Sequence, residues 1–136
     1  EWLVFNTFGE IDDPRKDHDP DELRELWIVK ADGSESHLLH RTDDWKWILS
    51  PAWSPDSSLL AFVVRKDVTT NTTVRTLWLT NVAGGQTRKL NETNQAVTDI
   101  VKVWWSPDGK YLYTVRDVSP SAVPSYVSSR LRLDTE

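Results

Sequence analysis

The sequence has neither cysteine nor methionine among its 136 residues. Without cysteine there is no disulfide framework, no thiolate metal site and no cysteine nucleophile, whereas the compartment stays open because many exported proteins also lack cysteine. Without methionine, residue 1 is not a translational start. We therefore expect the chain to be a processed product or a piece of a longer protein.

Long apolar runs and excess positive charge are also missing. No run approaches the roughly 18 apolar residues of a membrane-spanning helix, and the first ten residues have neither the basic nor the apolar part of a signal peptide. The 16 Lys and Arg residues face 21 Asp and Glu residues, which leaves no basic footprint for a phosphate backbone. We expect neither membrane insertion nor a nucleic-acid partner.

Motifs for catalysis and metal binding are missing as well. There is no Gly-x-Ser-x-Gly, no His-Glu-x-x-His and no phosphate-binding glycine loop, so we predict no catalytic residue and no cofactor. His37 and His40 are three residues apart, but on a strand we expect them to point to opposite sides, which disfavours a metal pair.

An acidic segment is similar to the start of a calcium loop, with alternating aspartates at Asp17, Asp19 and Asp21. It lacks the glycine of the sharp turn, and its twelfth position is Ile28 rather than glutamate. We interpret it as a solvated acidic insertion, so no metal site is predicted.

What the sequence does contain is a repeated unit. Trp-Ser-Pro-Asp begins at Trp53 and again at Trp105, 52 residues later, and Leu-Trp begins at Leu26 and again at Leu77, 51 residues later. A third set of matched apolar segments begins at Leu3, Leu60 and Leu112. The unit is written about two and a half times, and such periods predict repeat architectures.

Each unit is typical of strands and tight turns. The run from Leu60 to Val64 is apolar at every position, so a strand there must be covered on both faces, as in the packed sheets of a propeller. Ser-Pro-Asp-Gly favours a tight turn. Ser57 occupies the place of Gly109, and we predict a positive φ at Ser57 that costs about 1 kcal/mol.

This pattern predicts ten strands in three blades, of which only the second has all four strands. The first blade, about 1–41, has strands expected at 2–8, 24–31 and 36–40; the second, about 49–91, at 49–54, 59–66, 75–82 and 87–90; the third, about 97–136, at 99–105, 111–116 and 126–133. A closed propeller typically needs about four to eight four-stranded blades, so uncovered faces and unpaired edges are expected to drive association. We expect the missing blades to come from a longer chain rather than from other copies of this one.

The order of strand, Asp-Gly turn, Arg-Lys-Leu and Trp-Ser-Pro-Asp-Gly-Lys over about residues 24–117 resembles the WD-type repeat of TolB-like propellers. The same repeat occurs in the propeller domains of prolyl-oligopeptidase-family peptidases. The resemblance implies an all-β fold, a β-propeller fragment of about two and a half four-stranded antiparallel blades, in a periplasmic or extracellular protein. Departures are Ser57 for glycine, Ala83 where the first copy has Asp32, and the acidic insertion before Leu23.

Three functions remain open at this point. We prefer a non-catalytic module that binds a protein or peptide through its loops. The alternatives are the gating propeller of a serine peptidase whose catalytic domain lies outside this chain, and a structural repeat with no ligand. The fold alone does not decide among them.

Aromatic residues supply the candidate contacts. Four tryptophans at repeated strand positions are predicted to pack between blades: Trp27, Trp53, Trp78 and Trp105. The segment Trp45, Lys46 and Trp47 has no aromatic counterpart one period later and has the composition of an interface anchor in the connection between two blades. Asp99 and Lys102 are predicted to line the central channel, where they would also contact a partner.

Two glycosylation sequons fall in predicted turns, at Asn71 and at Asn91. They matter only if the protein is secreted by a eukaryote.

Overall fold

The structure is a computed structural model that describes residues 1–8, 24–42, 46–69, 72–84, 86–90, 100–118 and 125–133. These residues form ten strands and no helix, and every strand pair is antiparallel. The all-β prediction is therefore confirmed.

The strands form three sheets, which we call sheets A, B and C in chain order. Sheet A has three strands in the order β1 (Trp2–Phe8), β2 (Arg24–Lys30) and β3 (Ser36–Thr42). Sheet B has four, in the order β4 (Lys46–Trp53), β5 (Leu59–Thr69), β6 (Thr72–Asn81) and β7 (Thr87–Lys89). Sheet C has three, in the order β8 (Ile100–Trp105), β9 (Tyr111–Asp117) and β10 (Tyr126–Arg132). All ten predicted strands are present, with bounds that shift by a few residues.

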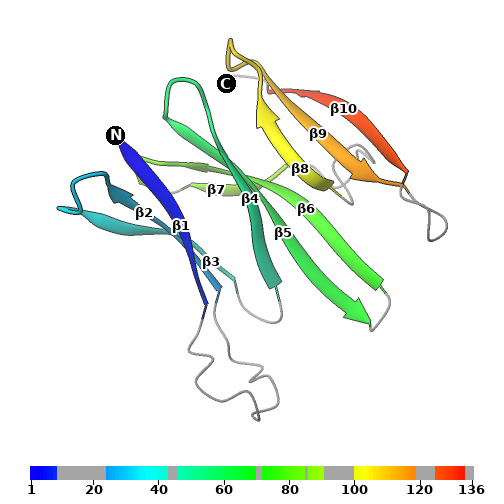
Figure 1. The fold of residues 1–136 in the computed structure, drawn as a ribbon, viewed down its shortest axis with the longest axis horizontal. Coiled ribbons are helices and arrows are strands. Elements are labelled where there is room, and N and C mark those ends of the chain that lie inside the picture. The colour runs from blue at the N-terminus through cyan, green and yellow to red at the C-terminus, as the bar shows by residue number, and fades with distance from the viewer. Residues whose placement is uncertain are drawn as a thin grey trace.

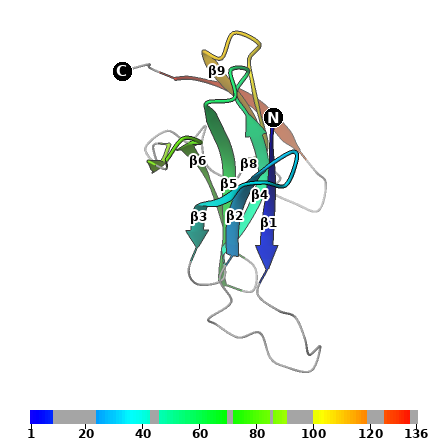
Figure 2. The same cartoon turned by 90° about the vertical axis from the view of Figure 1, so that its left-hand side faces the viewer.

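Sheet B lies between sheets A and C, with their faces packed together (Figures 1 and 2). The central strand β5 shows how this is achieved. Phe62 packs toward sheet A and Val63 toward sheet C, and the whole run from Leu60 to Val64 is buried. Because side chains alternate along a strand, an unbroken apolar run supplies both cores at once. The prediction that this strand is covered on both faces is confirmed.

Two separate apolar cores result. The core between sheets A and B contains Leu26, Ile28, Leu39, Ile48, Leu60, Phe62, Val64 and Val82. The core between sheets B and C contains Ala61, Val63, Leu77, Leu79, Leu90, Ile100, Val103 and Leu112. A direct hydrogen bond also joins sheets A and B, from Asn6 Nδ2 to the Ile48 carbonyl at 2.8 Å.

The turn between β4 and β5 is held by a buried serine. Ser54 Oγ donates to Asp56 Oδ1 at 2.6 Å and accepts from the Leu59 amide at 2.9 Å. The Ser54 hydrogen bond, followed by those from Ser58, lowers the pKa of Asp56 to about 2. This carboxylate therefore fastens the turn while it is ionised.

The turn between β8 and β9 has the same hydrogen bonds. Ser106 Oγ donates to Asp108 Oδ1 at 2.5 Å and accepts from the Tyr111 amide at 3.0 Å. Ser57 has φ 60° and Gly109 has φ 71°, so the predicted positive φ at Ser57 is confirmed. A serine here carries the strain that a glycine avoids.

Strand β3 departs from simple alternation. Its register against β2 shifts between Leu26 and Trp27, which leaves Leu39 as an extra residue. His37 reaches the Val82 carbonyl of sheet B at 3.3 Å, and the His40 ring lies 5.2 Å from the Phe62 ring. Both histidines therefore face sheet B, and the prediction of opposite sides is wrong because a bulge places neighbouring side chains on one side.

Three of the four repeated tryptophans lie between sheets, as predicted. Trp53 and Trp78 pack against the core between sheets A and B. Trp105 packs against the other core and donates from Nε1 to the Ala52 carbonyl at 2.9 Å. Trp27 differs, because it is half-buried on the side of sheet A that faces away from sheet B.

Candidate functional site

The first candidate surface is the side of sheet A that faces away from sheet B, which we call outer face A. Apolar side chains from all three strands gather there. Leu3 is 51% exposed, Phe5 41% and Leu38 36%, with Trp27 and Val29 half-buried beside them. A neighbouring cluster of exposed apolar side chains is typical of an interaction surface.

Outer face A has the residues that sheet B buries at matching positions. Phe5 corresponds to Phe62, 57 residues later, and Trp27 corresponds to Trp78, 51 residues later. Phe62 is completely buried and Trp78 packs beside it under sheet A. The same pair of aromatic residues is thus covered in sheet B and open in sheet A.

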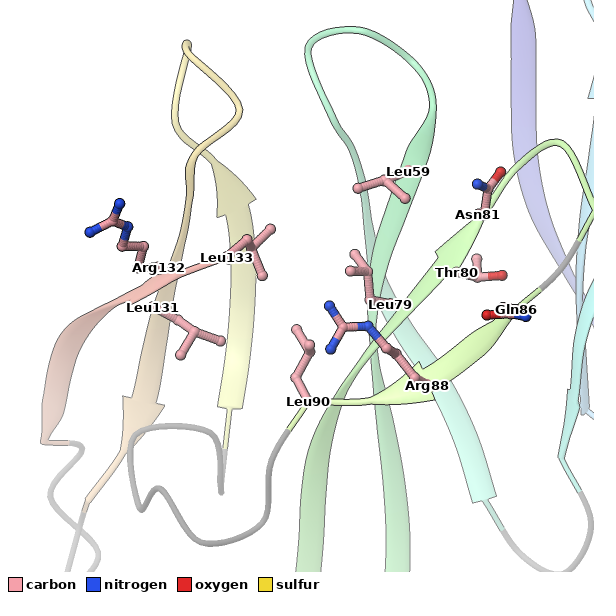
Figure 3. A pocket seen from close by; sticks show the side chains of 10 residues that line it. All are labelled: Leu59, Leu79, Thr80, Asn81, Gln86, Arg88, Leu90, Leu131, Arg132 and Leu133. Atoms are coloured by element: carbon pink, nitrogen blue, oxygen red, sulfur yellow. The ribbon is translucent and has the colours of Figure 1, made fainter. Parts of the chain in front are cut away.

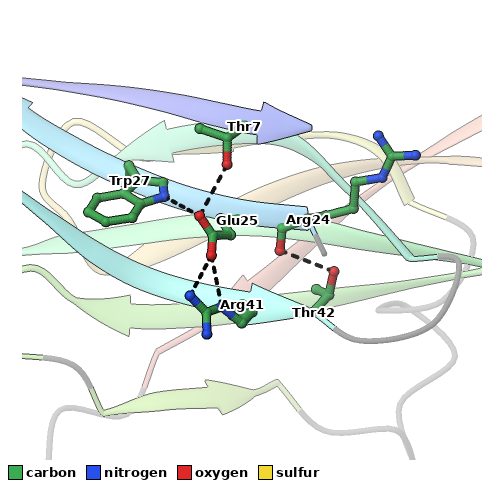
Figure 4. A network of polar contacts seen from close by, with 6 residues as sticks. All are labelled: Thr7, Arg24, Glu25, Trp27, Arg41 and Thr42. Carbon is green, nitrogen blue, oxygen red and sulfur yellow. Dashed lines mark hydrogen bonds and ion pairs between the residues drawn. The ribbon is translucent and has the colours of Figure 1, made fainter. Parts of the chain in front are cut away.

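A polar network borders outer face A and joins its three strands (Figure 4). The Glu25 carboxylate accepts from Trp27 Nε1 at 2.7 Å, from Arg41 Nε at 2.8 Å and from Thr7 Oγ1 at 3.3 Å. The hydrogen bond from Trp27, and then that from Arg41, lowers the pKa of Glu25 below its usual range. The network orients the Trp27 ring, so the apolar surface beside it is held in one shape.

The second surface is the side of sheet C that faces away from sheet B, which we call outer face C. It combines aromatic rings with cations. Trp104 stacks on Tyr113 with 5.9 Å between ring centroids, and the Arg130 guanidinium lies 4.6 Å from the Tyr111 ring centroid. Trp104 and Tyr113 face each other across β8 and β9.

Outer face C does not repeat the pattern of sheet B. Trp104 and Tyr113 stand 52 residues after Ala52 and Ala61, which face each other across β4 and β5 and pack in the core between sheets B and C. Two alanines that allow close sheet packing are replaced by two large rings. Outer face C is therefore shaped for different contacts from those made by sheet B.

The third surface is a groove of about 690 Å³ between sheet B and the far end of sheet C (Figure 3). Its apolar part comes from both sides, with Leu79 and Leu90 on sheet B and Leu131 and Leu133 on sheet C. Polar residues complete the lining: Thr80, Asn81, Gln86, Arg88 and Arg132. The Arg132 side chain points away from Leu131 and Leu133 (Figure 3). The described lining is therefore mixed, with leucines and polar residues in about equal share and arginine as its only charged residue type.

Strand β10 forms one margin of this groove and is the last strand of sheet C in the described residues. The Leu133 amide donates to Lys110 and the Ser125 carbonyl accepts from Val118, so odd-numbered residues direct their backbone groups toward β9. The register from Tyr126 to Arg132 is unbroken. Even-numbered residues therefore direct their N–H and C=O groups away from β9.

The five predicted contact residues are not gathered into one described site. Lys46 and Trp47 lie inside β4 rather than in the connection where we predicted them, because that strand begins three residues early. The Arg24 guanidinium lies 4.2 Å from the Trp47 ring centroid, which gives this tryptophan a packing role between sheets A and B. Trp45 lies outside the described residues.

Lys102 is exposed in β8 and pairs with Val115, which places it on outer face C. Trp104, two residues later in β8, lies on the same face. Asp99 lies outside the described residues, as do Asn71, Asn91 and the acidic residues Asp17, Asp19 and Asp21. The predicted contact by Lys102 stays a prediction.

The described part of the chain offers no group of three histidine, aspartate or glutamate side chains placed to hold a metal ion. Within the same ranges, no helix has the length and apolar character needed to cross a membrane.

Sequence reasoning expected uncovered outer faces, but it missed the groove and the combination of aromatic rings and cations on outer face C. The one available indication is the alternation of Arg130, Leu131, Arg132 and Leu133, which predicts a strand with one cationic and one apolar side. A comparison with protein-family models finds none that matches this chain.

Proposed function

We propose that sheets A, B and C are neighbouring blades of an incomplete β-propeller and that the chain is a non-catalytic module that binds protein or peptide partners. The stacking supports this arrangement, because sheet B presents a separate apolar core to each neighbour. The matched turns support it too, since each joins the first two strands of its sheet through the same serine and aspartate contacts. Blades of a propeller are related in this way.

Outer face A is the observation that carries the binding function. Phe5 and Trp27 are the counterparts of Phe62 and Trp78, which a neighbouring sheet covers. Burying such side chains stabilises an association by roughly 25 cal/mol for each Å² of apolar area removed from water. The surface therefore fits a protein partner with an apolar face, and in a solution of this chain alone the available partner is another copy.

The test is sedimentation velocity of the 136-residue chain at micromolar concentration. We expect the chain to self-associate and the Phe5→Lys variant to shift toward monomer, because a lysine on outer face A loses its hydration in the contact. Val74→Lys is the matched control, because Val74 in β6 is 39% exposed, close to the 41% of Phe5.

Thermal unfolding of both variants checks that they fold. A wild-type chain that sediments as a single monomer would contradict the proposal, as would equal effects of Phe5→Lys and Val74→Lys.

A further inference from the structure

We propose that outer face C binds an acidic segment of a protein partner, with carboxylates next to two cations, Lys102 and Arg130, and apolar side chains over the Trp104 ring. This deepens the proposed function by naming the chemistry of one partner, and it rests on that function. The surface involved lies at the opposite end of the stack from outer face A (Figures 1 and 2).

The strand register places rings and cations side by side on outer face C. Trp104 pairs with Tyr113, which pairs with Arg130, so these three side chains form a row across β8, β9 and β10. Lys102 lies two residues before Trp104 in β8, on the same face of the sheet. A cation therefore lies at each end of the ring pair.

The matched positions are aliphatic where another sheet of the stack covers them. Sheet B presents four aliphatic side chains to sheet C: Ala52, Leu59, Ala61 and Leu79. The residues 51 or 52 positions later on outer face C are aromatic or cationic: Trp104, Tyr111, Tyr113 and Arg130. Because large rings prevent the close sheet packing that alanine allows, the partner of outer face C is not another sheet of this repeat.

Outer face C is exposed and carries more positive than negative charge. Trp104 is 39% exposed, and Tyr126 on the same face is 60% exposed. The described charged residues of this face are three cations and one carboxylate: Lys102, Arg130, Arg132 and Asp117. The chain as a whole has a formal net charge of −5. A local excess of cations on an acidic protein gives charge complementarity to a partner's carboxylates.

The side-chain chemistry favours a protein partner. Tryptophan, tyrosine and arginine are the residue types most enriched among those that dominate protein interfaces. The Arg130 guanidinium lies over the Tyr111 ring, 4.6 Å from its centroid, which restricts the arginine side chain. Its N–H groups lie in the guanidinium plane, where a carboxylate can accept two parallel hydrogen bonds. Arg130 is thus positioned to bind a carboxylate.

Single-stranded nucleic acid also binds to cations beside aromatic rings, but outer face C fits it less well. Bases stack on open ring faces, whereas Trp104 and Tyr113 stack on each other with 23° between their planes. The net charge of −5 also opposes a phosphate backbone. Both observations favour an acidic protein segment.

The probe is the peptide Glu-Glu-Ser-Leu-Leu-Ser-Glu-Glu, titrated into the 136-residue chain. Calorimetry measures the affinity, and NMR shifts of backbone amides and of the Trp104 indole N–H locate the site. A Trp104→Phe variant assigns that indole signal. We expect the shifts to centre on outer face C. Peptides with lysine for glutamate, or with serine for leucine, should bind at least about fivefold more weakly.

Charge reversal tests the two cations. Arg130→Glu and Lys102→Glu should each weaken binding of the glutamate peptide about fivefold and strengthen binding of the lysine peptide by a similar factor. Lys66→Glu is the matched control, because Lys66 is an exposed lysine on the side of sheet B that faces sheet A. It changes the net charge equally and should leave both affinities unchanged. Thermal unfolding checks that all three variants fold.

Equal effects of Lys66→Glu and Arg130→Glu, or shifts centred on outer face A, would overturn the inference. Tighter binding of an eight-nucleotide single-stranded DNA than of the glutamate peptide would also overturn it. The result is independent of the sedimentation test. If Phe5→Lys abolishes self-association but the peptide does not bind, only the inference about outer face C is wrong. If the peptide binds but Phe5→Lys changes nothing, the role of outer face A is wrong.

Discussion

Outer face A and outer face C end the same stack of sheets but differ in chemistry. Outer face A keeps the apolar residues that sheet B buries, with Phe5 in the place of Phe62. Outer face C replaces Ala52 and Ala61 with Trp104 and Tyr113 and adds cations. The difference shows that a repeated sequence position predicts the face of the sheet on which a side chain lies, whereas the neighbouring sheet decides whether that side chain is buried or exposed.

The first prediction tests the comparison where the largest effect is expected. It replaces a buried phenylalanine, Phe62, and its exposed counterpart, Phe5, with alanine. Phe62→Ala should lower the free energy of unfolding by about 3–5 kcal/mol, because it opens a cavity in a completely buried site. Phe5→Ala should change it by less than about 1 kcal/mol. Urea unfolding at a protein concentration at which sedimentation shows monomer measures both, and equal losses would show that outer face A is covered within a single chain.

The second prediction exchanges the side chains of two matched positions, one inside the stack and one on outer face C. Ala61→Tyr should destabilise the chain by about 1–3 kcal/mol or more, since the core between sheets B and C has no room for a ring. Tyr113→Ala should cost only about 1 kcal/mol, because Tyr113 is half-buried. A neutral Ala61→Tyr variant in urea unfolding would refute the close packing of sheets B and C.

The third prediction sharpens the comparison at the matched turns. Ser57→Gly should raise stability by up to about 1 kcal/mol, and Gly109→Ser should lower it by a similar amount, because both positions have positive φ. A Cβ at Gly109 meets Pro55 Cδ at 3.7 Å, an ordinary contact, so backbone strain is the only cost. Opposite shifts in melting temperature are expected, and a lower value for Ser57→Gly would contradict the strain.

The smallest effect concerns acid and the border of outer face A. The folded pKa of Glu25 lies below its usual value, so its contribution is present above the unfolded pKa and is lost as pH falls through the folded pKa. Glu25→Gln should therefore flatten the fall in melting temperature between about pH 5 and about pH 3. An unchanged slope would mean that the Trp27 and Arg41 contacts do not favour the ionised form.

Much of the fold could be predicted because its causes are local. The run from Leu60 to Val64 is apolar at every position, so any strand there needs two covers. Ser54 and Asp56 form their turn with residues within five positions of one another. The bulge at Leu39 could not be predicted, because it depends on how β3 fits against both β2 and sheet B. The same bulge turned His37 and His40 to one side.

The candidate surfaces were harder to predict. The segment with Lys46 and Trp47 has the composition of a contact site, yet the Trp47 ring packs against the Arg24 guanidinium. Only the fold brings Arg24 and Trp47 together. The groove joins Leu90 with Leu131, which are 41 residues apart in the chain. A sequence shows the apolar alternation of each strand but not which strands of different sheets meet at the groove.

By itself the sequence determined the ten strands, the two serine–aspartate turns and the two-sided burial of β5, because alternation and turn chemistry act over a few residues. Only the tertiary structure decided which of the repeated aromatic residues are covered and which residues line the groove. These depend on contacts between segments about fifty residues apart, and each repeated side chain takes its role from the sheet placed against it.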